Sequence, residues 1–243
     1  MKITAKTDVG SVRKQNQDSY AVGEVSDGVS WAVVCDGMGG AAGGAVASTM
    51  AVQMISEKIY AVRREMLTES FIRSILVSTI ENANTNIYDY SRSNPELTGM
   101  GTTAVAVITV DDKAYIAHVG DSRAYKLSAN GDLTQITTDH SMVQQLVEMG
   151  DITPQQARIH PERNIITRAV GVDEKVRVDF TCEEFNTGEI LLICSDGLSG
   201  YVEDSEIAKI VYNEDFRECA DRLVNLAVEN GGGDNITVVL ISR

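Results

Sequence analysis

The feature that most constrains the fold of this chain is an apolar run that ends in an acid and a cluster of glycines, residues 30–40 (SWAVVCDGMGG). The run 31–35 is too short for a buried helix and has glycines on both sides, so it predicts a strand. Asp36 then stands at the strand end, where the glycines let the backbone bend and an ion or ligand approach. Asp-Gly after a strand is also the commonest hairpin signal, so this stretch alone favours a plain turn over a functional site.

Acids beside glycine or small polar residues recur at other strand ends. Asp196 follows the apolar run 189–194 and is itself followed by glycine, whereas Asp234 precedes the apolar run 236–241. Near the N-terminus, Asp18 follows a polar loop. Several carboxylates gathered at strand ends would repel one another unless cations lay between them. The recurrence therefore predicts a metal centre.

Hydrophobic periodicity predicts a mixture of helices and antiparallel strands. The middle of the chain contains hairpins that turn at residues 111–112 and 130–131. Because few βα units alternate, the order of elements favours a layered α+β fold over a doubly wound parallel sheet. The expected strands are 2–8, 18–25, 31–35, 102–110, 113–119, 122–127, 175–182, 189–194 and 236–241, and the expected helices are 44–60, 68–90, 142–149, 154–158, 203–212 and 216–229.

Composition narrows the class of protein. The 243 residues suffice for one large domain, and no linker, repeat or low-complexity tract divides them. Lys and Arg number 21 against 35 Asp and Glu, and the net charge of −14 argues against a nucleic-acid or anionic-membrane partner. The first residues form no apolar signal segment and no apolar run approaches membrane-spanning length, so we expect a cytoplasmic protein.

Six short motifs stand in order along nearly the whole chain: Arg13 with Asn16-Gln17-Asp18, Asp36-Gly37-Met38-Gly39-Gly40, Gly99-Met100-Gly101-Thr102-Thr103, Gly120-Asp121-Ser122-Arg123, Ser195-Asp196-Gly197 and Gly233-Asp234-Asn235. Together they resemble the motif set of the metal-dependent Ser/Thr protein phosphatases, the PPM family, in its compact bacterial form. The resemblance implies an α+β fold, a four-layer α-β-β-α sandwich of two antiparallel sheets flanked by helices, with a metal cleft at one end. It also implies a single phosphatase domain over residues 1–243, with a small flap insert at about 141–170.

The resemblance implies roles for the acids at the strand ends. Asp36 would bridge two divalent cations, and the Gly37 carbonyl and Asp18, directly or through water, would serve the second of them. Asp196 and Asp234 would complete the first. Oxygen ligands suit hard ions, so the implied cofactor is Mn²⁺ or Mg²⁺ rather than Zn²⁺. Two such ions can hold a bridging water and aim it at phosphorus, which requires no covalent enzyme intermediate.

Further residues take roles from the same resemblance. Arg13 would grip the phosphate oxygens with its planar fork, and Asn235 would hydrogen-bond and orient a ligand carboxylate. Asp121 would help to hold a third, weaker ion, although a plain turn aspartate is the alternative. Many relatives carry a histidine, a proposed general acid, just after the first Asp-Gly or shortly after the glycines. Met38 and Ala41 fill those places here, so the histidine is not available as the proton source for the leaving oxygen, and a metal-bound water is expected instead.

The implied function is hydrolysis of phosphoserine and phosphothreonine on proteins, in opposition to a bacterial Ser/Thr kinase. We therefore expect phosphoproteins as partners, including the cognate kinase, and a monomeric enzyme whose flap is a substrate-selecting surface. Two other functions are weighed against this one. A catalytically dead binding module on the same fold would be expected to have lost metal ligands, and all of them are present. A metal-dependent hydrolase of small phosphoesters would need the same acids, so the acids do not exclude it.

Cysteine and histidine residues give no support to other chemistries. No Cys-x-x-Cys pair occurs, and the cysteines are expected to be reduced core residues. A thiol phosphatase needs an arginine six residues after its cysteine, and an aspartyl-phosphate enzyme usually has a second Asp two residues after the first; neither pattern is present. The histidines lack a metal-ligand spacing and are expected on the surface or in the core. The residues concerned are Cys35, Cys182, Cys194, Cys219, His118, His140 and His160.

Overall fold

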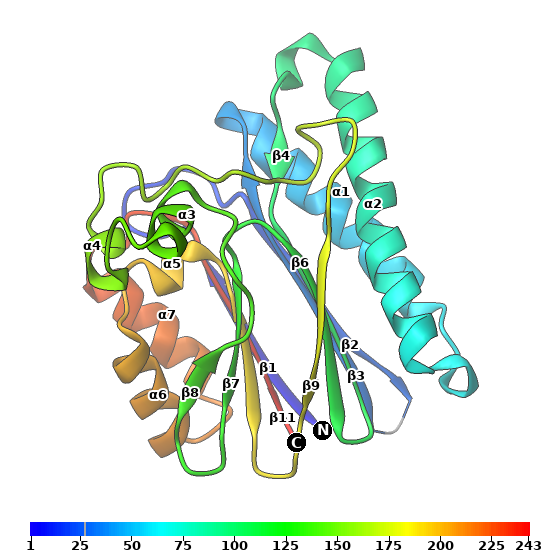
Figure 1. The fold of residues 1–243 in the computed structure, drawn as a ribbon, viewed down its shortest axis with the longest axis vertical. Helices are drawn as coiled ribbons and strands as arrows, with labels where there is room; N and C mark the ends of the chain where they lie inside the picture. The colour runs from blue at the N-terminus through cyan, green and yellow to red at the C-terminus, as the bar shows by residue number, and fades with distance from the viewer. Residues whose placement is uncertain (27) are drawn as a thin grey trace.

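Two antiparallel sheets form the centre of the computed structural model, which describes residues 1–26 and 28–243 apart from the side chains of Ala41 and Ala42 (Figure 1). The strands are β1 (Lys2–Asp8), β2 (Asp18–Ser26), β3 (Val29–Met38), β4 (Gly101–Thr102), β5 (Ala104–Val110), β6 (Lys113–Val119), β7 (Arg123–Leu127), β8 (Leu133–Gln135), β9 (Asp179–Glu184), β10 (Ile190–Cys194) and β11 (Ile236–Ser242). One sheet has the order β1-β11-β10-β7-β8 and the other the order β2-β3-β5-β6-β9, with β4 paired to β3.

Helices cover the outer face of each sheet. They are α1 (Gly40–Tyr60), α2 (Glu69–Ser93), α3 (Met142–Met149), α4 (Pro154–Arg158), α5 (Asp196–Ser199), α6 (Asp204–Asn213) and α7 (Cys219–Glu229), with 3-10 turns at Arg64–Met66 and Pro95–Leu97. The pair α1 and α2 packs on the sheet that contains β3, and the pair α6 and α7 packs on the sheet that contains β11 (Figure 1). The α-β-β-α sandwich expected from the sequence is confirmed. None of the described helices combines the length and apolar character needed to cross a bilayer.

Strand β3 shows why the apolar run carries no polar alternation. Val33 and Cys35 join the core between their sheet and the helices, whereas Ala32 and Val34 join the core between the two sheets. Successive side chains of a strand point to opposite faces, and here both faces are covered, so every position is apolar. The four cysteines are free: Cys35, Cys194 and Cys219 are buried and Cys182 is half-buried.

Several element boundaries differ from the expectations. The expected strand 102–110 is interrupted at Thr103, because this residue turns its hydroxyl and backbone to Asp36 and Ser122. The expected strand 175–182 begins later, at Asp179, and the sequence predicts neither of the short elements β8 and α5. Both predicted hairpin turns are confirmed, at Asp111 with φ 52° and at Gly131 with φ 89°.

The acids that end or begin strands meet at one end of the sandwich, and the two chain termini lie at the opposite end (Figure 1). The carboxyl end of β3 reaches this end close to the start of α1. A Cβ on Gly37 would lie 2.1 Å from the carbonyl oxygen of Gly44, so only glycine fits where β3 meets the helix. The fold thus requires the glycine that follows Asp36.

Candidate metal centre

Asp36 lies at the end of β3, where its backbone is fixed by Thr103. The Asp36 N–H donates to Thr103 Oγ1 at 2.9 Å, and the Thr103 N–H donates to the Asp36 carbonyl at 2.8 Å. These contacts leave the carboxyl directed into a cleft. Burial raises the pKa of Asp36 well above its usual range, and the carboxylates of Asp18 and Asp196 raise it further. The site therefore concentrates negative charge where water solvates it only in part.

Asp18 is the neighbour of Asp36 across the β2–β3 ladder. Its Oδ2 accepts hydrogen bonds from Ser195 Oγ and Thr237 Oγ1, both at 2.7 Å. Its Oδ1 is buried and has no protein partner. Burial raises the pKa of Asp18 to about 6, although the two hydroxyls act to lower it. Asp18 is absent from the residues that line the cleft, so it lies beneath the other acids.

Ser195 and Thr237 are functional residues that the sequence analysis missed. The sequence presents Ser195 only as part of a motif, yet its hydroxyl both donates to Asp18 and accepts from the Thr237 N–H at 2.9 Å. The sequence signal that could have indicated this contact is the small hydroxyl residue directly before Asp196. Thr237 is one inward-facing position of an apolar strand, and only the packing of the two sheets shows that it reaches Asp18, because β11 and β2 belong to different sheets.

Asp196 and Asp234 approach from the other sheet. Asp196 is the first residue of α5 and is separated from the end of β10 by Ser195, and its Oδ1 is buried without a partner. Burial raises the pKa of Asp196 to about 6, and Asp234 raises it further. Asp234 accepts the N–H of Asn235 on Oδ1 at 2.8 Å and an Arg13 guanidinium N–H on Oδ2 at 2.7 Å.

Asp121 follows Gly120 in the turn after β6. Gly120 has φ +104°, and a Cβ there would lie 2.6 Å from the Thr103 side chain, so the turn needs glycine. Asp121 is only 9 % exposed. Burial raises the pKa of its carboxyl well above the usual range, and Asp196 adds to the shift. The structure thus brings Asp121 to the other acids.

We call Asp18, Asp36, Asp121, Asp196 and Asp234 the acidic centre. A cleft of about 510 Å³ opens over it, and Arg13, Gly37, Met38 and Asn235 are among the other lining residues. The unpartnered carboxylate oxygens and the mutual repulsion of these acids fit divalent cations. All candidate donors are oxygen atoms, which suit Mg²⁺ or Mn²⁺. The expected set of ligands therefore forms a site that fits the expected ions.

Asn235 differs from its expected role. Its side-chain oxygen accepts the Gln17 N–H at 2.8 Å, and its side-chain nitrogen donates to the carbonyls of Val9 and Gln15. The amide therefore anchors the loop that carries Arg13. Only the backbone N–H of Asn235 touches a carboxylate, that of Asp234. The loop between β1 and β2 lacks ladder partners for these backbone groups, so a side chain must supply them.

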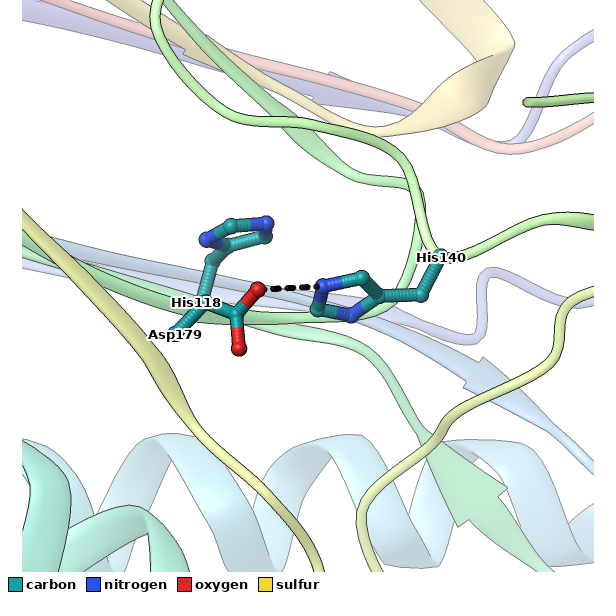
Figure 2. Close-up of side chains that lie close together, drawn as sticks. All are labelled: His118, His140 and Asp179. Carbon is teal, nitrogen blue, oxygen red and sulfur yellow. Dashed lines mark hydrogen bonds and ion pairs between the residues drawn. The ribbon is translucent and has the colours of Figure 1, made fainter. Parts of the chain in front are cut away.

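A second group of possible ligands is formed by His118, His140 and Asp179 (Figure 2). His140 hydrogen-bonds Gly120, the residue before Asp121. The ring N–H of His118 donates to the Thr138 carbonyl, and the two imidazoles stack with centroids 4.7 Å apart. Burial lowers the pKa of both histidines, that of His140 to about 4, so the rings are neutral. Both ring nitrogens of His140 are already engaged, with Gly120 and Asp179. This group is therefore a hydrogen-bonded core cluster, as expected of core histidines.

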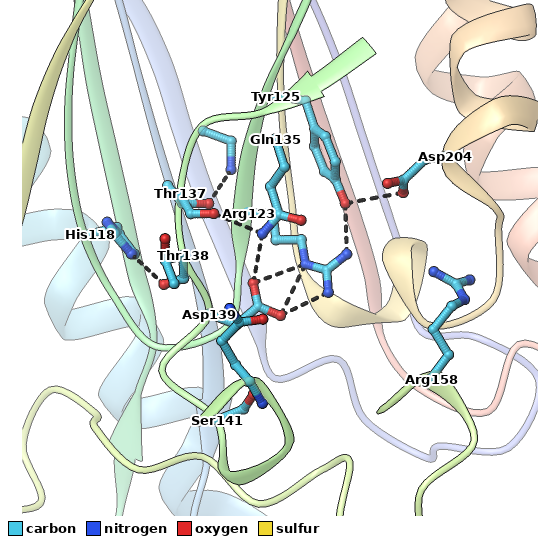
Figure 3. Close-up of polar contacts among 12 residues, drawn as sticks. His118, Arg123, Tyr125, Gln135, Thr137, Thr138, Asp139, Ser141, Arg158 and Asp204 are labelled. Atoms are coloured by element: carbon cyan, nitrogen blue, oxygen red, sulfur yellow. Dashed lines mark hydrogen bonds and ion pairs between the residues drawn. The ribbon is translucent and has the colours of Figure 1, made fainter. Parts of the chain in front are cut away.

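A network of hydrogen bonds fixes residues that precede the flap segment 141–170 (Figure 3). Arg123 donates from Nε and Nη2 to the carboxylate of Asp139 and from Nη1 to the Tyr125 hydroxyl. Gln135 also donates to Asp139, at 3.0 Å. The segment itself contains α3 and α4, as expected, and its residues Asn164 and Ile166 reach the cleft.

Comparison with known proteins identifies the family. The family model described as protein phosphatase 2C matches residues 11–238. The chain belongs to the protein phosphatase 2C family. The serine/threonine phosphatase stp of Listeria monocytogenes is 42% identical over 239 residues, which cover 98% of this chain and 94% of that protein.

Two solved structures of this phosphatase 2C fold agree with the architecture. Stp1 from Staphylococcus aureus superimposes with a TM-score of 0.92 at 36% identity and covers 99% of this chain and 94% of its own. The catalytic domain of PstP in complex with two manganese ions gives a TM-score of 0.84 at 34% identity, over 98% of this chain and 96% of that chain. The resemblance inferred from the six motifs is confirmed.

Proposed function

We propose that this protein phosphatase 2C member hydrolyses phosphoserine and phosphothreonine on proteins, using two Mn²⁺ or Mg²⁺ ions held at the acidic centre. The observation that carries the proposal is the convergence of five carboxylates from both sheets, with unpartnered oxygens on Asp18 and Asp196. The two manganese ions in the PstP catalytic domain support the choice of ion. When bound, such ions activate a water molecule and offset charge on the phosphoryl group.

Different acids would hold different ions. The carboxylates of Asp18 and Asp196 both act on the pKa of Asp36, and Asp36 is the group that would contact both ions. Asp196 and Asp234 would hold the first ion, and the Gly37 carbonyl would hold the second. Asp18 lies below the cleft, so it would serve the second ion through water. Asp121 would hold a third ion together with Asp196.

Arg13 is the proposed phosphate-binding residue. Its side chain is 52 % exposed, lines the cleft and contacts Asp234 at 2.7 Å. A guanidinium in this position can bind two phosphate oxygens while it stays close to the ions. Among the described residues that line the cleft there is no histidine. Met38 occupies one of the two positions at which relatives carry a histidine. The other position is Ala41, whose side chain the structure does not describe. Solvent is therefore the proposed proton source for the leaving oxygen.

The flap segment 141–170 is the proposed substrate-selecting surface, as part of a single phosphatase domain over residues 1–243. A second cleft of about 610 Å³ lies between α3, α4 and α6, and it adjoins the acidic centre at Asp121 and Asp196. Residues flanking a phosphorylated side chain could contact this cleft. We further propose a cytoplasmic monomer that opposes a Ser/Thr kinase and accepts that kinase as a substrate.

The test is phosphate release from matched phosphoserine, phosphothreonine and phosphotyrosine peptides and from a phosphosugar, in Mn²⁺ and in EDTA. We expect turnover of the first two peptides in Mn²⁺ and none in EDTA. Asp36→Asn is the matched control, because it keeps the shape of the side chain and loses its charge. Preferred turnover of the phosphosugar would favour the small-phosphoester function, and activity that survives exhaustive chelation would contradict the metal centre.

A further inference from the structure

His140 holds both backbone polar groups of Gly120. Its Nδ1 accepts the Gly120 N–H at 3.0 Å, and its backbone N–H donates to the Gly120 carbonyl at 3.0 Å. Gly120 directly precedes Asp121 and has the left-handed φ of +104°. His140 is thus a clamp on the turn that carries Asp121.

The tautomer of His140 is fixed by its surroundings. An amide N–H can only donate, so Nδ1 carries the lone pair and Nε2 carries the proton. The Nε2–H donates to Asp179 Oδ2 at 3.2 Å (Figure 2), and Arg168 donates to Asp179 Oδ1 at 2.8 Å. Arg168 and Asp179 together therefore keep Nδ1 available for Gly120.

The carboxylate of Asp121 depends on this clamp. In the described part of the chain, no side chain hydrogen-bonds to it, so its direction follows from the backbone of its own turn. We propose that His140 is a positioning residue for Asp121, which directs the Asp121 carboxylate at the acidic centre by holding Gly120. The inference rests on the proposed function, in which Asp121 binds a metal ion. The His140 carbonyl also accepts the Thr167 N–H at 2.7 Å, so the same residue joins the Asp121 turn to the far end of the flap segment.

Two variants separate the two ring nitrogens of His140. In His140→Asn the side-chain oxygen occupies the place of Nδ1 and can accept from Gly120, while the contact with Asp179 is lost. In His140→Gln the side-chain nitrogen occupies the place of Nε2 and can donate to Asp179, while Gly120 loses its acceptor. Calorimetric titration of Mn²⁺ into EDTA-stripped protein measures the weakest ion, with Asp121→Ala as the reference for its loss. We expect roughly 10-fold weaker binding of this ion in His140→Gln and a change within about threefold in His140→Asn.

Asp179→Asn tests the same clamp without changing His140. The Arg168 guanidinium only donates, so it would keep the oxygen of the new side-chain amide toward itself and turn the NH₂ group toward His140 Nε2. Two donors cannot face each other, and a proton on Nδ1 would face the Gly120 N–H just as a proton on Nε2 would face the new NH₂ group. His140 therefore keeps only one of its two contacts and releases Gly120 in the molecules that carry the proton on Nδ1. We expect a loss of the weakest Mn²⁺ in the same direction as in His140→Gln, up to roughly 10-fold. This variant also answers the question if His140→Gln does not fold.

Thr137→Val is the matched control in the same segment (Figure 3). Thr137 Oγ1 accepts the Ala124 N–H at 3.0 Å and does not touch Gly120, so the variant should lower the unfolding temperature and leave Mn²⁺ binding unchanged. Wild-type affinity for the weakest ion in His140→Gln and Asp179→Asn would overturn the inference. Equal losses in His140→Asn and His140→Gln that follow their unfolding temperatures would also overturn it. If Asp121→Ala itself loses no ion, the proposed role of Asp121 is wrong instead.

Discussion

The acidic side chains of the acidic centre and those of a neighbouring cluster have opposite electrostatic surroundings. We call that cluster, Arg123, Asp139, His140, Arg168 and Asp179, the flap stem. In the flap stem each acid faces a guanidinium: Arg123 lies 2.7 Å from Asp139, and Arg168 lies 2.8 Å from Asp179. In the acidic centre Arg13 is the one described basic group within salt-bridge distance of an acid, and it reaches only Asp234.

The acids of the flap stem are paired with guanidinium groups and stabilise the fold, whereas most acids of the acidic centre lack such a partner and need cations to offset their charge. Burial acts to raise the pKa of Asp179, yet contacts with Arg168 and His140 lower it overall. Burial and like charges both raise the pKa of Asp36, which has no such partner. Charges that are buried without counter-charges destabilise a fold. The acidic centre is therefore retained at a cost in stability, as expected of a site that binds ions.

The largest expected effect is the loss of activity in Asp36→Asn. A neutral amide cannot contact two cations, so several kcal/mol of transition-state stabilisation should disappear and turnover should fall by roughly 1000-fold or more. Steady-state kinetics on one phosphothreonine peptide at saturating Mn²⁺ measures it. Near-normal turnover would remove the contrast between the two regions, because Asp36 would then be an ordinary buried acid.

The opposite behaviour is expected of Asp139→Asn in the flap stem. Arg123 and Asp139 are 21% and 11% exposed, so the variant leaves Arg123 largely buried without its charged partner. It should lower the free energy of unfolding by about 2–3 kcal/mol. Denaturant unfolding measures the loss, and the affinity of the folded variant for the two tighter Mn²⁺ ions should match wild type. Unchanged stability would show that the ion pair contributes nothing.

Arg13→Ala is expected to act on substrate binding. A paired, charge-assisted contact with phosphate contributes about 1.5–3 kcal/mol, so KM should rise roughly 10- to 100-fold. Turnover at saturation should fall less, because Arg13 holds substrate and transition state alike. Arg13→Lys should recover part of the loss. An unchanged KM would leave Arg13 as a partner of Asp234 only, and loss of Mn²⁺ binding would give it a role in shaping the centre.

The fold was largely predictable because its signals are local. Three local patterns each predict an element: the continuous apolar run before Asp36, the helical periodicity of α1 and α2, and the turn residues at Asp111 and Gly131. Strand β8 was missed because it has only three residues, which are largely exposed and give no apolar signal. The start of β9 was misplaced because its partner β6, which fixes the register, lies far away in sequence.

An acid beside a glycine was the clearest signal of the site, and Asp18, which has no glycine neighbour, was predicted from the polar loop before it and from the family resemblance. Asp36, Asp121, Asp196 and Asp234 have a glycine neighbour, and the structure brings them together. The contacts of the Asn235 amide depend on the path of the 9–17 loop, which leaves no local pattern. For His140 the sequence predicts only a surface or core position, because its contact with Gly120 joins a turn to the base of the flap segment twenty residues away.

Thermal unfolding of the EDTA-treated protein, with and without Mn²⁺, tests the central claim most directly when wild type and Asp36→Asn are compared. At a Mn²⁺ concentration of about 100 times its Kd, wild type should gain about 2.7 kcal/mol in the free energy of unfolding. Asp36→Asn should unfold at a higher temperature than wild type in EDTA, because one uncompensated acid is gone, and should gain little from Mn²⁺. The account would be contradicted if Mn²⁺ left the unfolding temperature of wild type unchanged and the variant unfolded at a lower temperature than wild type in EDTA.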